Sequence, residues 1–279
     1  MQVKFGTRTF ERGGADLGEL RDSNALLGDW TAIHQRMGED GYLWFRQLID
    51  PARVSTARTT VLQYLDQQAA LAPGESVLEG VMTRGGKSVN LKGRAGIAHH
   101  PDVLAAVESP SLFEFFAGYF NEPAVTFPYK WLRAVGNEEY TGAHYDVVYM
   151  GLGSSRLHTT WIPMGDIPVE LGTLAVCVGS HRLDSFAPLR NTYGRGDVDR
   201  DGIDGWFTSD PLEVTQKFGG QWRTADFSAG DVMIFGMYTL HASTTNITHR
   251  YRLSCDVRYQ PASHPMDARW TKTGKGHNK

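Results

Sequence analysis

The sequence contains very few cysteines. Among 279 residues there are only two, Cys177 and Cys255, and each lies in an apolar stretch typical of a buried strand. Small secreted proteins depend on several disulfides, which two cysteines cannot supply. We therefore expect two core thiols and a reducing compartment.

Long apolar runs and an excess of positive charge are also missing. No stretch reaches the roughly 18 apolar residues that a membrane-spanning helix needs, and the first residues lack the apolar segment of a secretion signal. Lysine and arginine number 28 against 31 aspartate and glutamate, which leaves a net charge of −3 and no electrostatic basis for binding nucleic acid. We expect a cytoplasmic protein whose partner is a small molecule, with no nucleic-acid or membrane partner. The sequence gives no indication of the oligomeric state.

The chain has a helical first part and a strand-rich second part, with no internal repeat. Asp50-Pro51 combines a capping residue with a proline at the first helical position, which predicts a helix to about Gln68. Further expected elements are helices over 27–37 and 101–120, the latter broken near Ser109-Pro110, and a strand over 41–45.

From about residue 125 onward, short strand-like stretches alternate with glycine, proline, aspartate and asparagine. This pattern predicts a mainly β fold with buttressing helices, built on a double-stranded β-helix (jelly-roll or cupin-like) core. We expect one domain over 1–279. Its parts are an N-terminal arm (1–26), a mostly helical buttress (27–124), the β core (125–260) with a lid-like insertion (183–222), and a tail (261–279).

The triplet His144-Tyr145-Asp146, with His241 about a hundred residues later, is the strongest sign of chemistry. Two histidines and one carboxylate can occupy one face of an octahedral metal and leave the other face open, which is the ligand set of non-haem Fe(II) oxygenases. If residues 145–150 form a strand, alternate side chains point the same way, so His144 and Asp146 can converge on one ion. An isolated His-x-Asp triplet is also common in polar loops, and the surrounding sequence must decide.

The stretch from Tyr251 to Tyr259 alternates strictly between apolar and polar residues. Alternate residues of a strand face opposite sides. We therefore expect an apolar face, and an opposite face that carries Arg252, Ser254, Asp256 and Arg258.

Several stretches in this order resemble the phytanoyl-CoA dioxygenase-like family of Fe(II)/2-oxoglutarate-dependent oxygenases. They are Gly142-Ala-His-Tyr-Asp146, Trp161-Ile-Pro-Met-Gly-Asp-Ile-Pro168, Gly172-Thr-Leu-Ala-Val-Cys-Val-Gly-Ser-His181 and Ala229-Gly-Asp-Val-Met-Ile-Phe235. The separation of His241 from Arg252 also matches that family. The resemblance covers residues 27 to 260.

The resemblance implies a ligand set and a cosubstrate site. Fe(II) would be bound by His144, Asp146 and His241, and Arg252 would bind the distal carboxylate of 2-oxoglutarate, because a guanidinium matches a carboxylate through two parallel hydrogen bonds. The other cofactor-binding candidates are Ser254, Trp161, Thr159, Lys130 and Arg133. Lys130 and Arg133 lie on opposite faces of one expected strand, so only one of them points inward, and the sequence does not say which.

The resemblance also implies a reaction with O2 in which 2-oxoglutarate yields succinate and CO2 while an unactivated C–H bond of the substrate is hydroxylated. Desaturation, epoxidation and ring formation use the same chemistry and stay open. The carboxylate of Asp146 argues against halogenation, since related halogenases have a small residue there. A zinc hydrolase is one remaining alternative, but it has no use for Arg252 and Ser254. A non-catalytic binding protein is the other, and the intact set of three metal ligands and the arginine argues against it.

The substrate itself is not readable from the sequence. Residues 72–98 and the insertion 183–222 are long irregular segments, and loops of this length are often functional. Aromatic candidates for a substrate pocket are Tyr149, Tyr238, Phe127, Trp206 and Trp222. We expect a small or mid-sized organic substrate.

Overall fold

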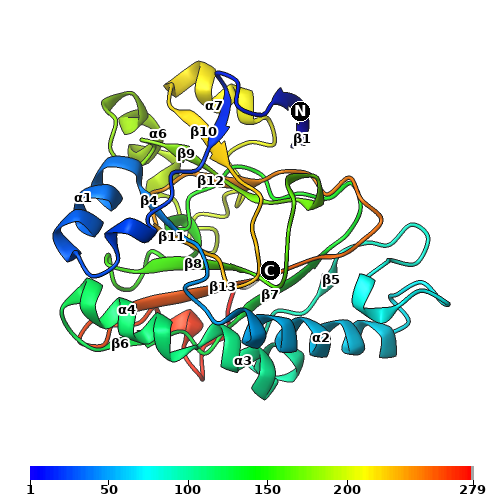
Figure 1. Cartoon of the computed structure of the whole chain (residues 1–279). Helices are drawn as coiled ribbons and strands as arrows, with labels where there is room; N and C mark the ends of the chain where they lie inside the picture. The colour runs from blue at the N-terminus through cyan, green and yellow to red at the C-terminus, as the bar shows by residue number, and fades with distance from the viewer. Residues whose placement is uncertain (278–279) are drawn as a thin grey trace.

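Two β-sheets form the centre of the computed structural model, which describes residues 1–277 (Figure 1). The larger sheet is antiparallel throughout. Its strands, in spatial order, are β4 (Tyr42–Phe45), β11 (Val232–Gly236), β8 (His158–Pro163), β13 (Arg252–Pro261), β7 (Trp131–Val135) and β5 (Val89–Asn90), with β6 (Ala124–Thr126) also paired to β13.

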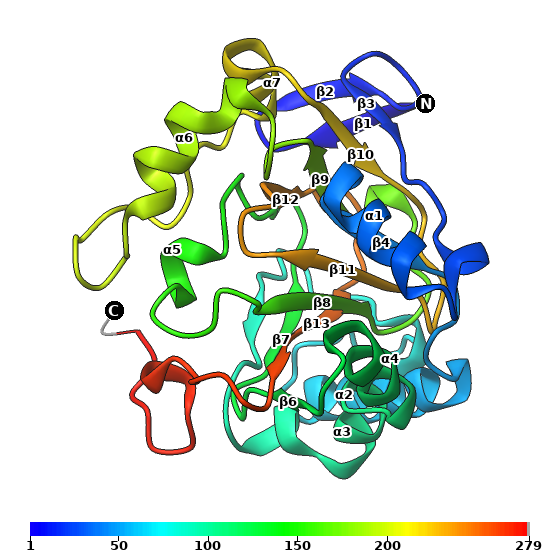
Figure 2. The same cartoon turned by 90° about the vertical axis from the view of Figure 1, so that its left-hand side faces the viewer.

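The smaller sheet lies above the larger one in Figure 2. Its strands are β12 (His241–Ser243), β9 (Leu174–Val178), β10 (Gln221–Thr224) and β3 (Leu17–Glu19). The two sheets make up a double-stranded β-helix of the jelly-roll kind, buttressed by helices, as the sequence predicted. The sheets do not close into a barrel.

The first 26 residues are more regular than the arm expected from the sequence. They contain the hairpin β1 (Gln2–Phe5) and β2 (Arg8–Glu11), and β3 joins the smaller sheet parallel to β10. Phe5 and Phe10 pack with Trp222 in a buried cluster. Strands of three or four residues carry too little alternation for the sequence to reveal them.

Helices cover the outer face of the larger sheet. They are α1 (Trp30–Asp40), α2 (Pro51–Gln67), α3 (Pro101–Val107) and α4 (Pro110–Phe120), and Figure 1 shows the last three side by side below the strands. The carboxylate of Asp50 accepts a hydrogen bond from Ala52 N at 2.9 Å, which confirms the predicted cap. The predicted break at Ser109-Pro110 also occurs, because the residue before a proline disfavours helical backbone.

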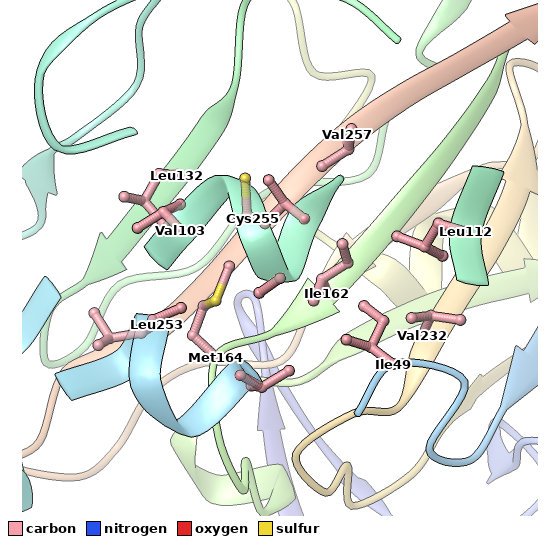
Figure 3. Close-up of a cluster of buried hydrophobic side chains, with 14 of the residues drawn as sticks. Ile49, Val103, Leu112, Leu132, Ile162, Met164, Val232, Leu253, Cys255 and Val257 are labelled. Atoms are coloured by element: carbon pink, nitrogen blue, oxygen red, sulfur yellow. The ribbon is translucent and has the colours of Figure 1, made fainter. Parts of the chain in front are cut away.

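Strand β13 has two chemically different faces. Its apolar side chains, including Leu253, Cys255 and Val257, pack with Val103 and Leu112 of the helical layer in the main core (Figure 3). Its polar side chains point to the interior between the sheets. All five of them are at most 7% exposed: Arg252, Ser254, Asp256, Arg258 and Gln260. The predicted alternation is confirmed, and it sets a row of buried charges beside the candidate site.

The insertion 183–222 contains two helices, α6 (Ala187–Asn191) and α7 (Pro211–Phe218), and ends in β10. The segment after β13, which the sequence assigned to a tail, includes a residue that is buried against the rest of the molecule. Trp270 is only 2% exposed, and the end of the described chain lies on the same side as α5 (Val147–Met150) and α6 in Figure 2. The sequence did not reveal this contact, because it depends on the single residue Trp270 and not on a periodic pattern.

Both cysteines are free and buried, as expected. Within residues 1–277, none of the helices combines the length and the apolar character needed to cross a bilayer.

Candidate metal and cosubstrate site

The two histidines of the candidate site are cross-strand neighbours. His144 N donates to the carbonyl of His241 at 3.0 Å, and His241 N donates to the carbonyl of His144 at 3.1 Å. This antiparallel pairing joins the segment before α5 to β12 and brings the ring centroids to 4.1 Å. Backbone hydrogen bonds therefore unite residues that are about a hundred positions apart in the sequence.

Each imidazole is fixed in the form that binds a metal. His144 Nδ1 lies 2.8 Å from the carbonyl of Gly142, and His241 Nδ1 lies 3.0 Å from the carbonyl of Thr239. A carbonyl only accepts, so Nδ1 carries the proton and Nε2 presents its lone pair. Burial, together with the neighbouring His241, lowers the pKa of His144 to about 3, and burial also lowers the pKa of His241. Both rings are thus neutral near pH 7.

Asp146 completes the group from the N-cap position of α5. The sequence predicted a strand over 145–150; instead Asp146 has helical backbone angles and α5 begins directly after it. The prediction was wrong because β-branched Val147 and Val148 favour strands locally, whereas α5 packs its side chains against the interior. The convergence still occurs, since Asp146 Oδ1 lies 3.8 Å from Nε2 of each histidine.

The second oxygen of Asp146 is held by two partners. Thr159 Oγ1 donates to Oδ2, and Arg258 Nη2 lies 3.2 Å from the same atom. Burial by itself raises the pKa of Asp146, but Arg258 and the two imidazoles outweigh it and hold the pKa below its usual value. The carboxylate is therefore ionised. Its Oδ1 faces the Nε2 atoms of both histidines and also lies 3.3 Å from Arg258 Nη2.

These three residues form the only group of its kind among residues 1–277. Their possible ligand atoms lie within 4.8 Å of one another, and all three side chains are buried. Two neutral imidazole nitrogens and one carboxylate oxygen on one side of a space suit a divalent iron and leave further coordination positions free. The donor set thus fits the ion that the sequence implied.

Arg258 is the functional residue that sequence reasoning missed. Its place on the polar face of the 251–259 strand indicated that it points inward, but the sequence does not link it to Asp146. In the structure its guanidinium pairs with Asp146 and lies over the Trp131 ring, 4.6 Å from the centroid. It therefore acts on a candidate metal ligand.

Arg252 lies in a narrow cleft beside the histidines, together with Trp161 and Asp256. Its side chain is 2% exposed, its Nη1 donates to Ser254 Oγ, and its Nε has no hydrogen-bond partner. Burial and the neighbouring Arg133 lower the pKa of Arg252 to about 9. Within residues 1–277 this buried cation forms no ion pair. A carboxylate in the cleft would supply the missing partner, so the residues present fit 2-oxoglutarate.

The side chains of Lys130 and Arg133 point to opposite sides of the larger sheet. Lys130 Nζ lies 2.5 Å from Glu108 Oε1 at the end of α3, so Lys130 faces the helical layer and is not a cosubstrate ligand in this arrangement. Arg133 points to the interior, where its Nη2 lies 2.9 Å from Asp256 Oδ2. The alternation of side chains along the strand allowed only one of the two residues to point inward. Because the helices pack on the face that carries Lys130, that residue is Arg133.

A cavity of about 260 Å³ adjoins the candidate metal ligands. Tyr149 and Trp206, two of the aromatic residues predicted for a substrate pocket, line it. Of the other aromatic candidates, Phe127 and Trp222 are buried in the core, and Tyr238 is 38% exposed. The remaining lining residues are Lys92, Trp131, Arg133, Thr141, His144, Asp146, Met150, Arg258 and His277.

Comparisons with known proteins agree with this geometry. The model of the phytanoyl-CoA dioxygenase family matches residues 37–254. A curated relative, 1-deoxypentalenic acid 11-beta-hydroxylase of Streptomyces exfoliatus, is 24% identical over 265 residues, which cover 88% of this chain and 87% of the relative.

Two solved structures from nogalamycin biosynthesis share the fold. The epimerase SnoN, in complex with Fe3+, alpha ketoglutarate and nogalamycin RO, is 20% identical with a TM-score of 0.59, and the match covers 85% of each chain. The carbocyclase SnoK, described as non-heme and alpha ketoglutarate dependent, is 18% identical with a TM-score of 0.59, covering 88% of this chain and 89% of SnoK.

Proposed function

Because the chain belongs to the phytanoyl-CoA dioxygenase family, we propose that it hydroxylates an unactivated C–H bond at a metal centre formed by His144, Asp146 and His241. The enzyme is a non-haem iron, 2-oxoglutarate-dependent dioxygenase that acts on a small organic substrate. The name of the Streptomyces relative supports hydroxylation. Desaturation, epoxidation and ring formation are the alternatives, since SnoK is named a carbocyclase.

The side chains around the ligands would keep the centre in one geometry. Thr159 and Arg258 fix Asp146 so that one oxygen faces the ion, and the two backbone carbonyls fix the imidazoles. Iron and 2-oxoglutarate supply the oxidising chemistry when bound, with O2 consumed and succinate and CO2 released. The chain's remaining task is to orient the substrate and to exclude water.

Arg252 and Ser254 would bind the distal carboxylate of 2-oxoglutarate, with the Trp161 ring as a wall of the cleft. Arg133 lies at the edge of the same cleft and is held by Asp256. The observation that carries the proposal is this pairing of sites: a His-Asp-His group open to a cavity, next to a buried arginine without an anion. A zinc hydrolase would require the first site but not the second.

The test is an anaerobic titration of the purified protein with Fe(II) and 2-oxoglutarate, followed by the weak visible charge-transfer band of this pair. We expect the band in the wild type and its loss in His144→Ala. A well-folded wild type without any band would overturn the proposal and return the hydrolase and the binding protein to consideration.

Substitution of Arg252 tests the cosubstrate site. Loss of charge-assisted hydrogen bonds worth about 1.5–3 kcal/mol predicts that Arg252→Ala weakens 2-oxoglutarate binding by about tenfold to a hundredfold. Arg250→Ala is the matched control, because Arg250 is half-exposed and pairs with Glu79 at 2.6 Å. Equal 2-oxoglutarate affinities in the two variants would contradict the assignment.

We also propose that residues 1–279 form one oxygenase domain. The N-terminal strand β3 and the C-terminal Trp270, which packs against Tyr129 and Trp131, both belong to the body that contains the site and support this proposal. The cytoplasmic location stays a prediction.

A further inference from the structure

The charges that line the metal-side cavity are paired, with one exception. Arg258 is balanced by Asp146, and Arg133 is balanced by Asp256. Lys92, which follows β5, lines the same cavity, yet its ammonium makes no hydrogen bond or ion pair with any side chain of residues 1–277. Among the lysine and arginine side chains that line this cavity within residues 1–277, Lys92 is therefore the one without an ion pair.

Lys92 is exposed to solvent at the edge of this cavity, where its ammonium lies near the guanidinium of Arg133. Burial and repulsion by Arg133 lower the pKa of Lys92, whereas Asp256, which already pairs with Arg133, raises it. Arg133 has its Nε and Nη2 on Asp256 and keeps Nη1 without a partner in the described chain. A carboxylate between Lys92 and Arg133 would remove this repulsion.

Lys92 also stands where two cavities meet. A second cavity of about 520 Å³ shares Lys92, Arg133, Thr141 and Trp206 with the metal-side cavity of about 260 Å³. Ligand pockets commonly measure about 300–1,000 Å³ and have apolar walls with a few placed polar groups. Here the apolar walls beside the metal ligands include Trp131, Tyr149 and Met150, whose surfaces suit a flat or ring-containing body.

We propose that the substrate is an organic monocarboxylate whose carboxylate binds Lys92 and Arg133 while its apolar body lies among the aromatic side chains beside the metal. This assignment rests on the proposed function, and it names the substrate class. Lys92 Nζ and Arg133 Nη1 are two neighbouring donors, which suit the two oxygens of a carboxylate. Lys92 is thereby a specificity-determining residue, and Arg133 a second contact oriented by Asp256.

The experiment compares acids with their neutral amides. Phenylacetate, 1-naphthaleneacetate and 1-pyreneacetate, each with its amide, are titrated by calorimetry into the anaerobic protein saturated with Fe(II) and 2-oxoglutarate. Saturating 2-oxoglutarate keeps the probes away from Arg252. We expect at least one acid to bind the wild type about tenfold more tightly than its amide, because charge-assisted hydrogen bonds contribute about 1.5–3 kcal/mol.

Two variants of Lys92 and one of Lys87 test whether Lys92 causes the preference for the acid. Lys92→Gln should abolish the preference for the acid and leave the affinity of the amide unchanged, and Lys92→Arg should restore most of it. Lys87→Gln, which removes an outward lysine that is 77% exposed and belongs to the same loop, should retain the preference. An acid preference that survives in Lys92→Gln, or no acid preference in the wild type for any pair, would overturn the proposal.

The visible band of the iron and 2-oxoglutarate pair is recorded in the same samples. A band without acid preference would leave the proposed function standing and reject the carboxylate subsite. Acid preference that depends on Lys92 but occurs without a band would support the subsite and reject the iron assignment.

Discussion

Thr159 and Thr160 are adjacent on β8 and have opposite surroundings. Thr159 Oγ1 donates to Asp146, whereas the buried Thr160 Oγ1 has no hydrogen-bond partner. Thr159→Val keeps the shape of the side chain but releases one oxygen of a proposed metal ligand. We expect the affinity for Fe(II) to fall by about tenfold to a hundredfold, the usual effect of losing such a supporting contact, as measured by anaerobic Fe(II) titration.

Thr160→Val is the matched control for that substitution. It should leave Fe(II) affinity unchanged and should not lower the free energy of unfolding, because a buried hydroxyl without a partner costs stability. Similar Fe(II) affinities in the two valine variants would show that the Thr159 contact does not matter for the metal.

The roles of single residues could be predicted where the chemistry requires particular residue types at a particular spacing in the sequence. The sequence identified His144, Asp146 and His241, and the structure brings them together. It did not reveal that Arg258 pairs with Asp146, because that contact depends on where α5 begins, and the alternation of β13 does not contain this information.

At the scale of elements, one arginine joins the insertion to the C-terminal segment. Arg269 Nη1 lies 3.0 Å from Asp197 Oδ2 and 2.9 Å from Asp199 Oδ2, and its Nη2 lies 2.7 Å from Asp267 Oδ2. Asp197, Asp199, Asp201 and the left-handed Gly202 follow the spacing of a calcium loop. Here Asp197 and Asp199 pair with the guanidinium of Arg269, and the position of the loop's final glutamate holds Thr208.

Arg269→Met should therefore loosen the C-terminal segment. It leaves three carboxylates close together without their cation, and we expect hydrogen exchange of residues 266–277 to accelerate by about tenfold or more while the core amides stay protected. Hydrogen exchange read by mass spectrometry checks this. Arg200→Met removes an exposed arginine that pairs only locally with Asp201, and it should exchange like the wild type. An unchanged exchange rate in Arg269→Met would show that Arg269 does not hold the C-terminal segment in place.

Elements were predictable in proportion to their periodic length. The helix that opens at Asp50-Pro51 and the alternating β13 follow directly from capping and side-chain parity. The four-residue α5 and the strands of the first 26 residues do not, because tertiary packing decides elements that short.

For the molecule as a whole, His158 links the helical layer to the larger sheet. It lies among the rings of Phe116, Tyr119 and Phe120, with Nε2 3.2 Å from Tyr119 Oη and Nδ1 2.9 Å from the carbonyl of Arg156. Burial lowers its pKa from 6.5 to about 4. The folded protein therefore keeps this ring neutral at a pH where the unfolded chain protonates it.

The free energy of unfolding should consequently fall as the pH drops from 6.5 to about 4. One proton taken up only by the unfolded chain contributes up to about 1.4 kcal/mol per pH unit over that window. Urea unfolding of the metal-free protein across these pH values gives the slope. His144 and His241 add to it in the same direction, so the informative quantity is the difference between variants.

His158→Phe should flatten the slope by about one proton, whereas His249→Gln, at an exposed position, should not change it. A His158→Phe protein with the wild-type slope would mean that His158 is not held neutral in the fold.

The packing of the C-terminal segment has a practical side for handling the protein. His277 lines the metal-side cavity and contacts the rings of Tyr149 and Trp270. A polyhistidine purification tag fused after residue 279 would add imidazoles only a few positions further along the chain, where they would compete for iron. Met1 is 62% exposed and belongs to the β1–β2 hairpin side of the molecule, so a tag there keeps foreign ligands away from the ion.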